Sequence, residues 1–481
     1  MAPHSHTRVR FAPSPTGFMH IGNIRTALFN YLFARQKNGT FILRIEDTDA
    51  KRNFDPRAQK IIADLHWLNL SYDEGPNKEK GNAPYFQSLR LNLYQDYLNK
   101  LIKIGRAYRC FCSEEELSKK RDRQRSLKLP PRYDRTCLTL SSDEITQHTN
   151  ANIPFVWRFK LDHDKSITIT DLAKGKVTFE LKNFSDFPLT RSDGTFTFMF
   201  ANCVDDIVMK ITDIFRGEDH LSNTAGQAAL YETLHVPLPI FWHMPIICSP
   251  NGKKLSKRDF GFSLHDLQQA GFLPQAINNY LAIIGGSYEN EIMNLEELTQ
   301  IYDFNNPSSA SKIKYDVEKL RWINHQWINQ LAPEKLAELT RPFLAAKYPT
   351  ATLIETHNLA AMIQHIKTDL YTLKEATTAL HFYFEQPSLN QLSFESCISL
   401  LFIEKIIAMI QKQLHFIEKP EEFLNSLKSE AKILQIPIKE LFWFLRIALS
   451  GKINGPSIND LIAILGVENS KKRLQSALEL F

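Results

Sequence analysis

The sequence predicts an α/β domain followed by an all-helical region. Strand-like and helix-like segments alternate over residues 9–65, which is the pattern of a parallel sheet covered by helices. Fifteen of the 18 glycines lie before residue 287, and none lies between residues 287 and 450. Glycine marks tight turns, so its absence there predicts helices joined by short connections. At 481 residues the chain exceeds what one core usually organises, and we expect several domains.

The first elements can be justified in chain order. Residues 9–12 predict a short strand, and apolar side chains at helical spacing predict the helix that follows. Residues 41–47 are rich in β-forming side chains and predict a second strand. Asp55 and Pro56 then offer a cap and a first-turn proline for a second helix. Parallel sheets bind ligands beyond the carboxyl ends of their strands, which is where residues 13–23 fall.

Composition limits the classes of protein that the later residues can form. Residues from 336 onward predict helices, and residues 398–410 predict a buried helix that is too short and too charged to cross a membrane. The N-terminus lacks the apolar core of a secretory signal, so we expect a cytoplasmic protein without a membrane partner. Six cysteines make no disulfide framework in so long a chain. A net charge of +5 is too mild to indicate a nucleic-acid partner.

The loop after the first strand has the character of a phosphate site. Pro13 and Gly17 make a rigid turn, and His20, Gly22 and Asn23 stand directly before the helix. A helix N-terminus presents unpaired N–H groups and a partial positive charge, and Gly22 lets a nucleotide approach the backbone. The simpler explanation of this loop, taken alone, is that His20 and Asn23 only cap the helix.

Two distant motifs together resolve this choice. Residues 13–23 resemble the first signature of class I aminoacyl-tRNA synthetases, in the Pro-Ser-Pro-Thr-Gly form that marks the glutamyl branch. Residues 252–258, Gly-Lys-Lys-Leu-Ser-Lys-Arg, resemble the mobile lysine loop of the same class. A basic turn alone is usually only a solvated surface feature. The Gly-rich Walker pattern of other ATP-binding proteins is absent from the sequence.

The resemblance implies a domain plan for nearly the whole chain. A Rossmann-like catalytic domain would be split by an insertion and followed by an all-α anticodon-binding region. The implied segments are the first catalytic half (1–85), an insertion that binds the tRNA acceptor end (86–197), the second catalytic half (198–253), a stem-contact region with the lysine loop (254–330), and the two parts of the anticodon-binding domain (331–391 and 392–481).

The resemblance also implies the residues that activate glutamate with ATP. The substrate carboxylate attacks the α-phosphate, and positive groups with Mg2+ stabilise the negative charge that develops. The implied catalytic residues are His20, Asn23, Lys254 and Lys257. The implied ATP-binding residues are Pro13, His20, Gly22, Asn23, Glu218, Lys254, Ser256 and Lys257. The implied glutamate-binding residues are Arg10, Ala12, Ser14, Glu46, Phe198, Asn202 and Arg216.

Within the glutamate set, Arg10 and Arg216 would bind the γ-carboxylate and Glu46 the ammonium group. Taken alone, Arg10 could be an edge-strand charge, and Glu46 could pair with a neighbouring arginine, Arg44 or Arg52. Phe198 stands where many glutamyl enzymes carry tyrosine, so a hydroxyl donor is missing or comes from elsewhere. An uncompensated loss of one donor to a charged ligand costs roughly 1.5–3 kcal/mol.

Three cysteines in the insertion have unusual spacing. Cys110, Cys112 and Cys137 match the spacing of a zinc site found in some glutamyl enzymes. The expected position of a fourth ligand holds Thr139, so closure needs Tyr133, His148 or another group. Plain thiols without zinc are the rival interpretation.

The implied partners are ATP, L-glutamate and tRNA-Glu, bound by a monomer. Strict enzymes read the first anticodon base with an arginine, but Asp369 aligns there, which leaves room for charging of tRNA-Gln as well. A function of another class is a tRNA-binding paralogue that has lost its chemistry. The intact His20, Gly22, Lys254 and Lys257 argue against that alternative.

Overall fold

The computed structural model describes residues 6–49, 53–256, 259–307, 310 and 312–481. These residues divide into two compact units. Unit 1 contains the residues up to 266 together with 277–317, and unit 2 contains 267–276 together with 318–481. The predicted order of an α/β part followed by a helical part is confirmed, and the two units are described separately below.

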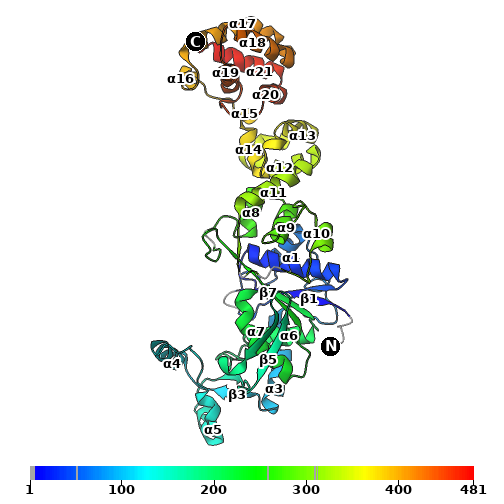
Figure 1. The fold of residues 1–481 in the computed structure, drawn as a ribbon, viewed down its shortest axis with the longest axis vertical. Coiled ribbons are helices and arrows are strands. Elements are labelled where there is room, and N and C mark those ends of the chain that lie inside the picture. Colours follow the sequence, from blue (N-terminus) through cyan, green and yellow to red (C-terminus); the bar gives the residue numbers. More distant parts are fainter. Residues whose placement is uncertain (1–5, 50–52, 257–258, 308–309, 311) are drawn as a thin grey trace. The chain divides into compact units, whose positions relative to one another are not determined.

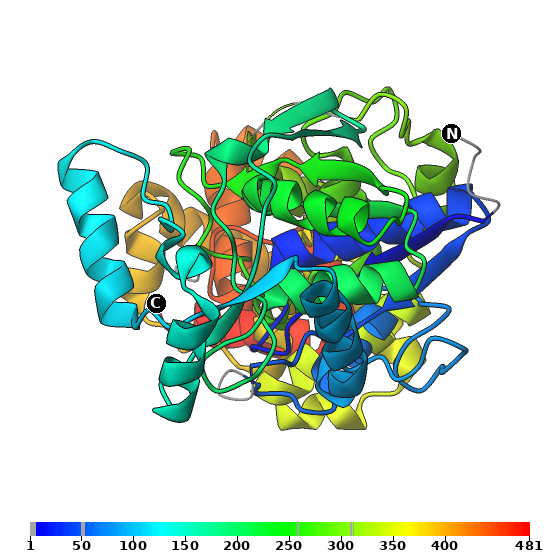
Figure 2. The ribbon, with the colours of Figure 1, turned by 90° about the horizontal axis from the view of Figure 1, so that it is seen from below.

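The predicted strand, helix and second strand are present at the start of unit 1. Strands β1 (Arg8–Phe11) and β2 (Thr40–Leu43) pair in parallel, with Arg8 opposite Thr40. Helix α1 (Ile21–Gln36) connects them and packs against both (Figures 1 and 2). The Thr212 N–H donates to the Arg8 carbonyl at 2.9 Å, which connects β1 to the residue directly before strand β7 (Asp213–Gly217).

A four-stranded sheet forms the middle of unit 1, in the order β6-β5-β8-β7. Strands β7 and β8 are parallel, β5 and β8 are parallel, and β5 and β6 form an antiparallel hairpin. Helix α6 precedes β7 in the chain, helix α7 follows it, and the two helices pack against each other. Their bounds are β5 (Ser166–Asp171), β6 (Gly175–Glu180), α6 (Phe198–Val208), β7 (Asp213–Gly217), α7 (Leu221–Thr233) and β8 (Ile240–Met244).

Two predicted boundaries differ from the structure. The second strand was expected over residues 41–47, but β2 ends at Leu43, and Ile45 instead pairs alone beside Phe86. The second helix, α2 (Gln59–Trp67), begins only after Ala58, whose φ of 52° is left-handed. The Asp55 carboxylate accepts from the first N–H groups of α2, at 3.0 and 2.9 Å. Asp55 therefore caps the helix as predicted, whereas Pro56 precedes the helix and does not belong to its first turn.

The other strands and α-helices of unit 1 lie within residues 91–159 and 246–314. Strands β3 and β4 pair antiparallel, and β9 and β10 pair in parallel. Helices α8 (Leu264–Ala270) and α9 (Pro274–Ile283) each run across the boundary between the units. The remaining bounds are α3 (Leu91–Lys103), β3 (Ala107–Cys110), α4 (Glu114–Ser126), α5 (Ser142–Asn150), β4 (Val156–Phe159), β9 (Ile246–Cys248), α10 (Leu295–Ile301) and β10 (Lys312–Lys314).

Helices alone make up the described elements after Lys314, as the glycine distribution predicts. Residues 398–410, expected to form a buried helix, correspond to α17, which is buried at Ile403 and Ile406 but exposed at Leu400 and Leu401. The helix is therefore amphipathic. The helices are α11 (Val317–Gln330), α12 (Pro333–Lys347), α13 (Thr356–Gln364), α14 (Ala376–Ala379), α15 (His381–Phe384), α16 (Gln391–Glu395), α17 (Leu400–Gln413), α18 (Pro420–Ile433), α19 (Ile438–Ser450), α20 (Ile458–Leu465) and α21 (Val467–Leu478).

Two expectations from composition can be compared with this fold. All six cysteines are free thiols, as predicted. Among the described residues, no helix combines the length and the apolar character that crossing a bilayer demands.

Candidate active site

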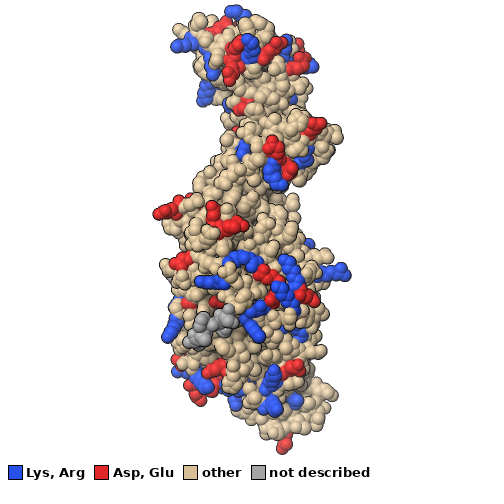
Figure 3. Space-filling model, turned by 90° about the vertical axis from the view of Figure 1, so that its right-hand side faces the viewer, with Lys and Arg blue, Asp and Glu red and all other residues tan. Residues whose placement is uncertain are grey.

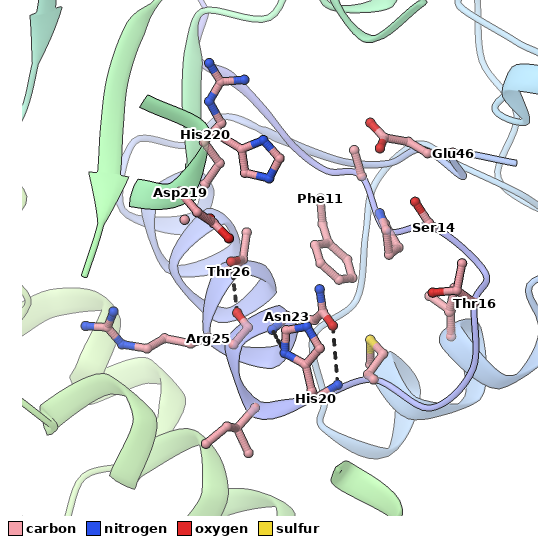
Figure 4. A pocket seen from close by; sticks show the side chains of 18 of the residues that line it. Phe11, Ser14, Thr16, His20, Asn23, Arg25, Thr26, Glu46, Asp219 and His220 are labelled. Atoms are coloured by element: carbon pink, nitrogen blue, oxygen red, sulfur yellow. Dashed lines mark hydrogen bonds between the residues drawn. The ribbon is translucent and has the colours of Figure 1, made fainter. Parts of the chain in front are cut away.

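The largest concentration of predicted site residues lines one cavity in unit 1, with a volume of about 590 Å³. The cavity lies where β1, β2 and β7 end, at the edge of the sheet that the sequence predicts for a ligand. Figure 4 shows Ser14 and Thr16 on the loop after β1, His20 and Asn23 at the start of α1, and Glu46 and His220 on other segments. The predicted residues that line the cavity are Arg10, Ala12, Pro13, Ser14, His20, Gly22, Asn23, Glu46, Phe198, Asn202, Arg216 and Lys254.

Three predicted residues are not among this lining. Glu218 points to Lys174, with 2.8 Å between the carboxylate and Nζ. Ser256 donates from its N–H and its hydroxyl to Asp259, at 2.8 and 2.9 Å. Lys257 lies outside the described residues.

His20 and Asn23 cap helix α1 and present donors at the same time. The Asn23 N–H donates to His20 Nδ1 at 3.3 Å, and the His20 N–H donates to Asn23 Oδ1 at 3.3 Å (Figure 4). Burial, together with the charge of Lys254, lowers the pKa of His20, so the ring is neutral at pH 7. With Nδ1 accepting, the ring proton sits on Nε2, and the Asn23 amide keeps its Nδ2 donors. Capping therefore leaves a donor on each side chain, so a capping role does not exclude a role in ligand binding.

The chain on both sides of this loop fixes its position. The Ile21 N–H donates to the Phe262 carbonyl at 3.0 Å, and the Phe262 ring stacks on His20 with 5.3 Å between centroids. Lys254, of the lysine loop, lies 67% exposed and pairs with Asp219 at 2.9 Å. Burial alone would raise the pKa of Asp219, but the hydrogen bond and charge of Lys254 lower it. Lys254 thus lines the cavity as a largely exposed side chain whose ammonium group is paired with Asp219.

Arg10 is a buried residue of β1, and its interpretation as an edge-strand charge is wrong. Its guanidinium donates to Asp206 at 3.1–3.2 Å and to the Phe215 carbonyl at 3.4 Å. Asp206 also accepts from Arg44 at 2.6 Å. Burial alone would raise the pKa of Asp206, but the charges of Arg10 and Arg44 lower it. Arg10 is therefore fixed in place by a buried carboxylate that two arginines share.

Arg216, on β7, is bound differently from Arg10. Its Nη1 donates to Gln227 Oε1 at 2.7 Å and its Nη2 donates to Thr224 Oγ1 at 2.6 Å. Its buried Nε has no hydrogen-bond partner, and no carboxylate of the described chain lies within ion-pair distance. Burial, helped by the charge of Arg10, lowers the pKa of Arg216 to about 10. The guanidinium is thus a buried positive charge at the cavity wall that an anion can neutralise.

Glu46 supplies the matching negative charge. Its carboxylate accepts a short hydrogen bond from the Asn202 amide and lies 3.7 Å from Arg44 Nη2. The Glu46 carboxylate is therefore hydrogen-bonded to Asn202 and lies within ion-pair distance of Arg44. Arg52, the other arginine considered as a partner, lies outside the described residues. Burial raises the pKa of Glu46 to about 7. A bound cation would favour the ionised carboxylate.

Phe198 is part of the cavity wall, and its ring lies 5.5 Å from the His220 ring. Burial and the charge of Arg216 lower the pKa of His220 to about 4, so its imidazole is neutral at pH 7. The Asn223 amide lies 3.3 Å from His220 Nδ1. If Nδ1 accepts from Nδ2 of Asn223, the ring presents an Nε2–H donor beside the apolar Phe198.

The sequence did not single out several buried residues that bind the substrate-facing ones. Gln227 connects Arg216 to Asn202, since its Nε2 donates to Asn202 Oδ1 at 3.4 Å. Thr224 and His243 are likewise 0–1% exposed and do not line this cavity. No local pattern indicated them, because each side chain acts through a partner on another element of the fold.

The predicted cysteine cluster is brought together elsewhere in unit 1. The Sγ atoms of Cys110, Cys112 and Cys137 lie within 4.8 Å of one another. The Tyr133 hydroxyl oxygen accepts from the Cys110 thiol at 3.3 Å and from the Cys137 N–H at 3.1 Å. Thr139 is turned to the Thr136 carbonyl, at 3.1 Å.

Comparison with known proteins agrees with this arrangement of fold and site. Residues 6–322 match the family described as tRNA synthetases class I (E and Q), catalytic domain, and residues 335–478 match an anticodon binding domain. The chain therefore belongs to the class I tRNA synthetases of the E and Q family, which are ligases that use ATP and tRNA.

The relatives to which the whole chain is similar include glutamate–tRNA ligases. The glutamate–tRNA ligase of Natranaerobius thermophilus is 38% identical over 98% of both chains, and that of Aquifex aeolicus is 37% identical over 99% of both. A solved glutamate–tRNA ligase from Elizabethkingia meningosepticum, in complex with its amino acid, superposes with a TM-score of 0.85 at 30% identity, over 99% of both chains.

Proposed function

We propose that this chain is a glutamate–tRNA ligase, which activates L-glutamate with ATP and transfers it to the 3′ end of tRNA-Glu. The observation that carries the proposal is Arg216, a buried guanidinium at the cavity wall without a carboxylate partner among the described residues. The full-length similarity to curated glutamate–tRNA ligases supports it.

The cavity offers side-chain partners of opposite charge for the γ-carboxylate and for the ammonium group of glutamate. The γ-carboxylate would bind Arg216, with Arg10 adding its remaining donors, because planar guanidinium groups match carboxylate geometry. The ammonium group would bind Glu46, whose pKa that cation would lower. Ala12, Ser14, Phe198 and Asn202 would enclose the rest of the amino acid.

The phosphate end of the site would stabilise charge by electrostatics, without a nucleophilic side chain. The α-carboxylate attacks the α-phosphate of ATP, and pyrophosphate departs. His20 Nε2–H and the Asn23 amide would donate to phosphate oxygens, while Gly22 allows close approach of the backbone. Lys254 would leave Asp219 and contact the phosphates, where negative charge develops. Lys257 would have the same role. Mg2+, when bound with ATP, would help to neutralise the negative charge that develops on the phosphates.

Two of the three predicted ATP-binding residues outside the cavity lining, Glu218 and Ser256, lie in the described part of the chain. Gly217 and Asp219, on either side of Glu218, do line the cavity, so the backbone there lies near the nucleotide site. For Ser256, release from Asp259 would be needed before it contacts ATP.

Glutamate-dependent ATP–pyrophosphate exchange, run with and without tRNA, tests the proposal. We expect exchange with glutamate under at least one condition, and loss of exchange in Arg216→Gln. Absence of exchange under both conditions would support the tRNA-binding paralogue instead.

A surface of unit 2 is suited to tRNA bases. A cavity of about 410 Å³ is lined by Lys428, Lys439, Phe442, Trp443 and Arg446, among others. Lys439 Nζ lies 4.5 Å from the Trp443 ring centre, and Lys428 Nζ lies 5.4 Å from that of Phe442. Aromatic faces with nearby positive charges bind unstacked nucleotides. Elsewhere basic and acidic side chains are interspersed, as on the face in Figure 3, so local contacts would direct binding.

A second candidate is charging of tRNA-Gln with glutamate in addition to tRNA-Glu. Its support is Asp369, an exposed acidic residue where the sequence alignment expects an arginine. A carboxylate would favour a different contact from a guanidinium at the first anticodon base. Aminoacylation of purified tRNA-Glu and tRNA-Gln, each with radiolabelled glutamate, distinguishes the candidates. No glutamate on tRNA-Gln would eliminate the second one.

We propose that the cysteine cluster binds zinc, with the three thiolates and Tyr133 as the four ligands of the metal. Tetrahedral zinc with bonds of about 2.3 Å needs sulfur atoms about 3.8 Å apart, and Cys112 and Cys137 Sγ lie at 3.5 Å. Tyr133 already contacts Cys110 and Cys137, whereas His148 Nδ1 is taken by the Glu144 carbonyl at 2.7 Å.

Metal analysis of the purified protein tests this site. We expect about one zinc per chain, loss of zinc in the cysteine variant Cys137→Ser, and faster removal by a chelator in Tyr133→Phe. A metal-free wild-type protein would favour plain thiols. We further propose that the enzyme acts as a monomer in the cytoplasm, which size-exclusion chromatography with light scattering and cell fractionation would check.

A further inference from the structure

Arg216 is held by neutral oxygen atoms, and one of them belongs to a longer buried chain. Thr224 Oγ1 accepts from Arg216 Nη2 at 2.6 Å and lies 2.7 Å from His243 Nε2. On the other side of the ring, His243 Nδ1 lies 2.7 Å from Asp171 Oδ2. The same carboxylate oxygen accepts the His243 N–H at 2.9 Å.

This chain connects three elements that are far apart in the sequence. Thr224 lies on α7, His243 on β8, and Asp171 at the end of β5. All three side chains are buried, at 0–1% exposure, and none lines the cavity. Asp171 and Phe241 form the only register pair recorded between β5 and β8 in the described chain, so the chain of hydrogen bonds begins where these strands meet.

The direction of each hydrogen bond follows from the groups involved. An ionised carboxylate only accepts, so His243 Nδ1 carries the proton that Asp171 accepts. Burial is the largest influence on the His243 pKa and lowers it, so the ring is neutral and Nε2 offers a lone pair. The Thr224 hydroxyl then donates to Nε2, in preference to the His220 carbonyl at 3.2 Å. The lone pairs of Thr224 remain for Arg216.

We propose that Asp171, His243 and Thr224 form a positioning relay that orients Arg216 for the γ-carboxylate of glutamate. The inference rests on the proposed function, since Arg216 is the proposed carboxylate ligand. None of the three residues touches the substrate. Each fixes the hydrogen-bond direction of the next, so Arg216 gains an acceptor that neutralises none of its charge.

At position 224, a hydroxyl group serves the relay better than a carboxylate would. A carboxylate there would bind Arg216 more strongly, but it would also cancel the charge that the substrate must meet. A hydroxyl whose proton is committed to His243 gives direction without a countercharge. The guanidinium therefore stays cationic and stays in one orientation.

Two pairs of variants test the relay, with exchange kinetics for glutamate and ATP as the readout. Thr224→Val removes the hydroxyl, and Thr224→Ser keeps it. His243→Asn retains a donor for Asp171 but is too short to reach Thr224, whereas His243→Gln places an amide oxygen near the former Nε2. We expect Thr224→Val and His243→Asn to raise the glutamate KM about tenfold or more, with kcat and the ATP KM within about threefold of wild type.

The conservative variants and a control complete the design. Thr224→Ser and His243→Gln should keep the glutamate KM within about threefold of wild type. Thr168→Val, on the exposed face of β5, removes a hydroxyl that pairs with Thr178 at 2.8 Å and should change none of these constants. Thermal unfolding of every variant shows whether it folds.

The possible outcomes separate the relay from the proposed function. An unchanged glutamate KM in Thr224→Val, or His243→Gln as impaired as His243→Asn, overturns the relay while wild-type exchange remains. A uniform change of all constants that follows the loss of stability would also overturn it, because it indicates a structural role only. If Thr224→Val does not fold, the two His243 variants decide. Wild-type protein without any exchange contradicts the proposed function itself.

Discussion

Replacing Arg216 by glutamine should leave the stability of unit 1 nearly unchanged while it removes glutamate activation. Burial lowers the pKa of Arg216 to about 10. Since the folded pKa lies below the unfolded one, the charged guanidinium costs stability at every pH below about 10. At 1.36 kcal/mol per pKa unit, the cost is about 3 kcal/mol. The two hydrogen bonds that this charged group donates, to Gln227 and Thr224, are worth about 1.5 kcal/mol each. They offset that cost, so the expected net change is within about 1 kcal/mol.

Urea unfolding and pyrophosphate exchange measure the two effects on the same protein. Arg216→Gln should unfold within about 1 kcal/mol of the wild type. It should lose about a hundredfold or more in kcat/KM for glutamate, because a charge-assisted pair contributes up to about 3 kcal/mol. Arg10→Gln is the matched control, as Arg10 lines the same cavity but pairs with the buried Asp206. It should unfold at lower urea, since it leaves that carboxylate with less compensation. An Arg216→Gln variant destabilised as much as Arg10→Gln, or a stabilised Arg10→Gln, would refute the reasoning.

Three further predictions concern the same cavity. Burial raises the pKa of Glu46 to about 7, so kcat/KM for glutamate in the wild type should fall about tenfold per pH unit below pH 7, and Glu46→Gln should abolish this dependence. Phe198→Tyr should lower the glutamate KM by up to about tenfold; an unchanged KM would mean that another donor already makes this contact. Gly22→Ala would place a Cβ 3.1 Å from the His20 ring, so exchange should slow by about tenfold with little change in thermal stability. Equal exchange rates would show that the ring can shift without consequence.

Local patterns predicted the first elements well, and the boundaries failed where distant residues intervene. The strand at β1 and helix α1 follow from alternation and helical spacing alone. The second strand ends at Leu43, but the backbone hydrogen bonds continue beyond it, since the Ile45 N–H donates to the Tyr85 carbonyl at 2.8 Å and the Glu46 N–H to the Pro13 carbonyl at 3.0 Å. Both acceptors lie on segments outside the named strands, so the regular ladder stops there although residues 44–46 remain paired. The start of α2 is delayed by the left-handed turn at Ala58, which nothing in the Asp-Pro pair indicates.

The same distinction holds for the site. His20, Gly22 and Asn23 could be located from sequence because a helix N-terminus collects its ligands from consecutive residues. Thr224 and His243 could not, because their roles arise only when α7, β8 and β5 are folded together. Asp171 lies within a segment assigned to the insertion, and its neighbours along the chain give no sign of its contact with His243.

The interleaving of the two units limits how the helical part can be isolated as a fragment. Segment 267–276 belongs to unit 2, although residues 277–317, which follow it, belong to unit 1. Within unit 2, the Leu273 N–H donates to the buried Asn324 side chain at 2.8 Å, and the Leu373 N–H donates to the Gly271 carbonyl at 2.9 Å. A fragment that begins at residue 318 would leave the Asn324 carboxamide and the Leu373 amide without these partners. Supplying 267–276 as a separate peptide should restore them, so the anticodon-binding part is a candidate for fragment complementation but not for simple truncation.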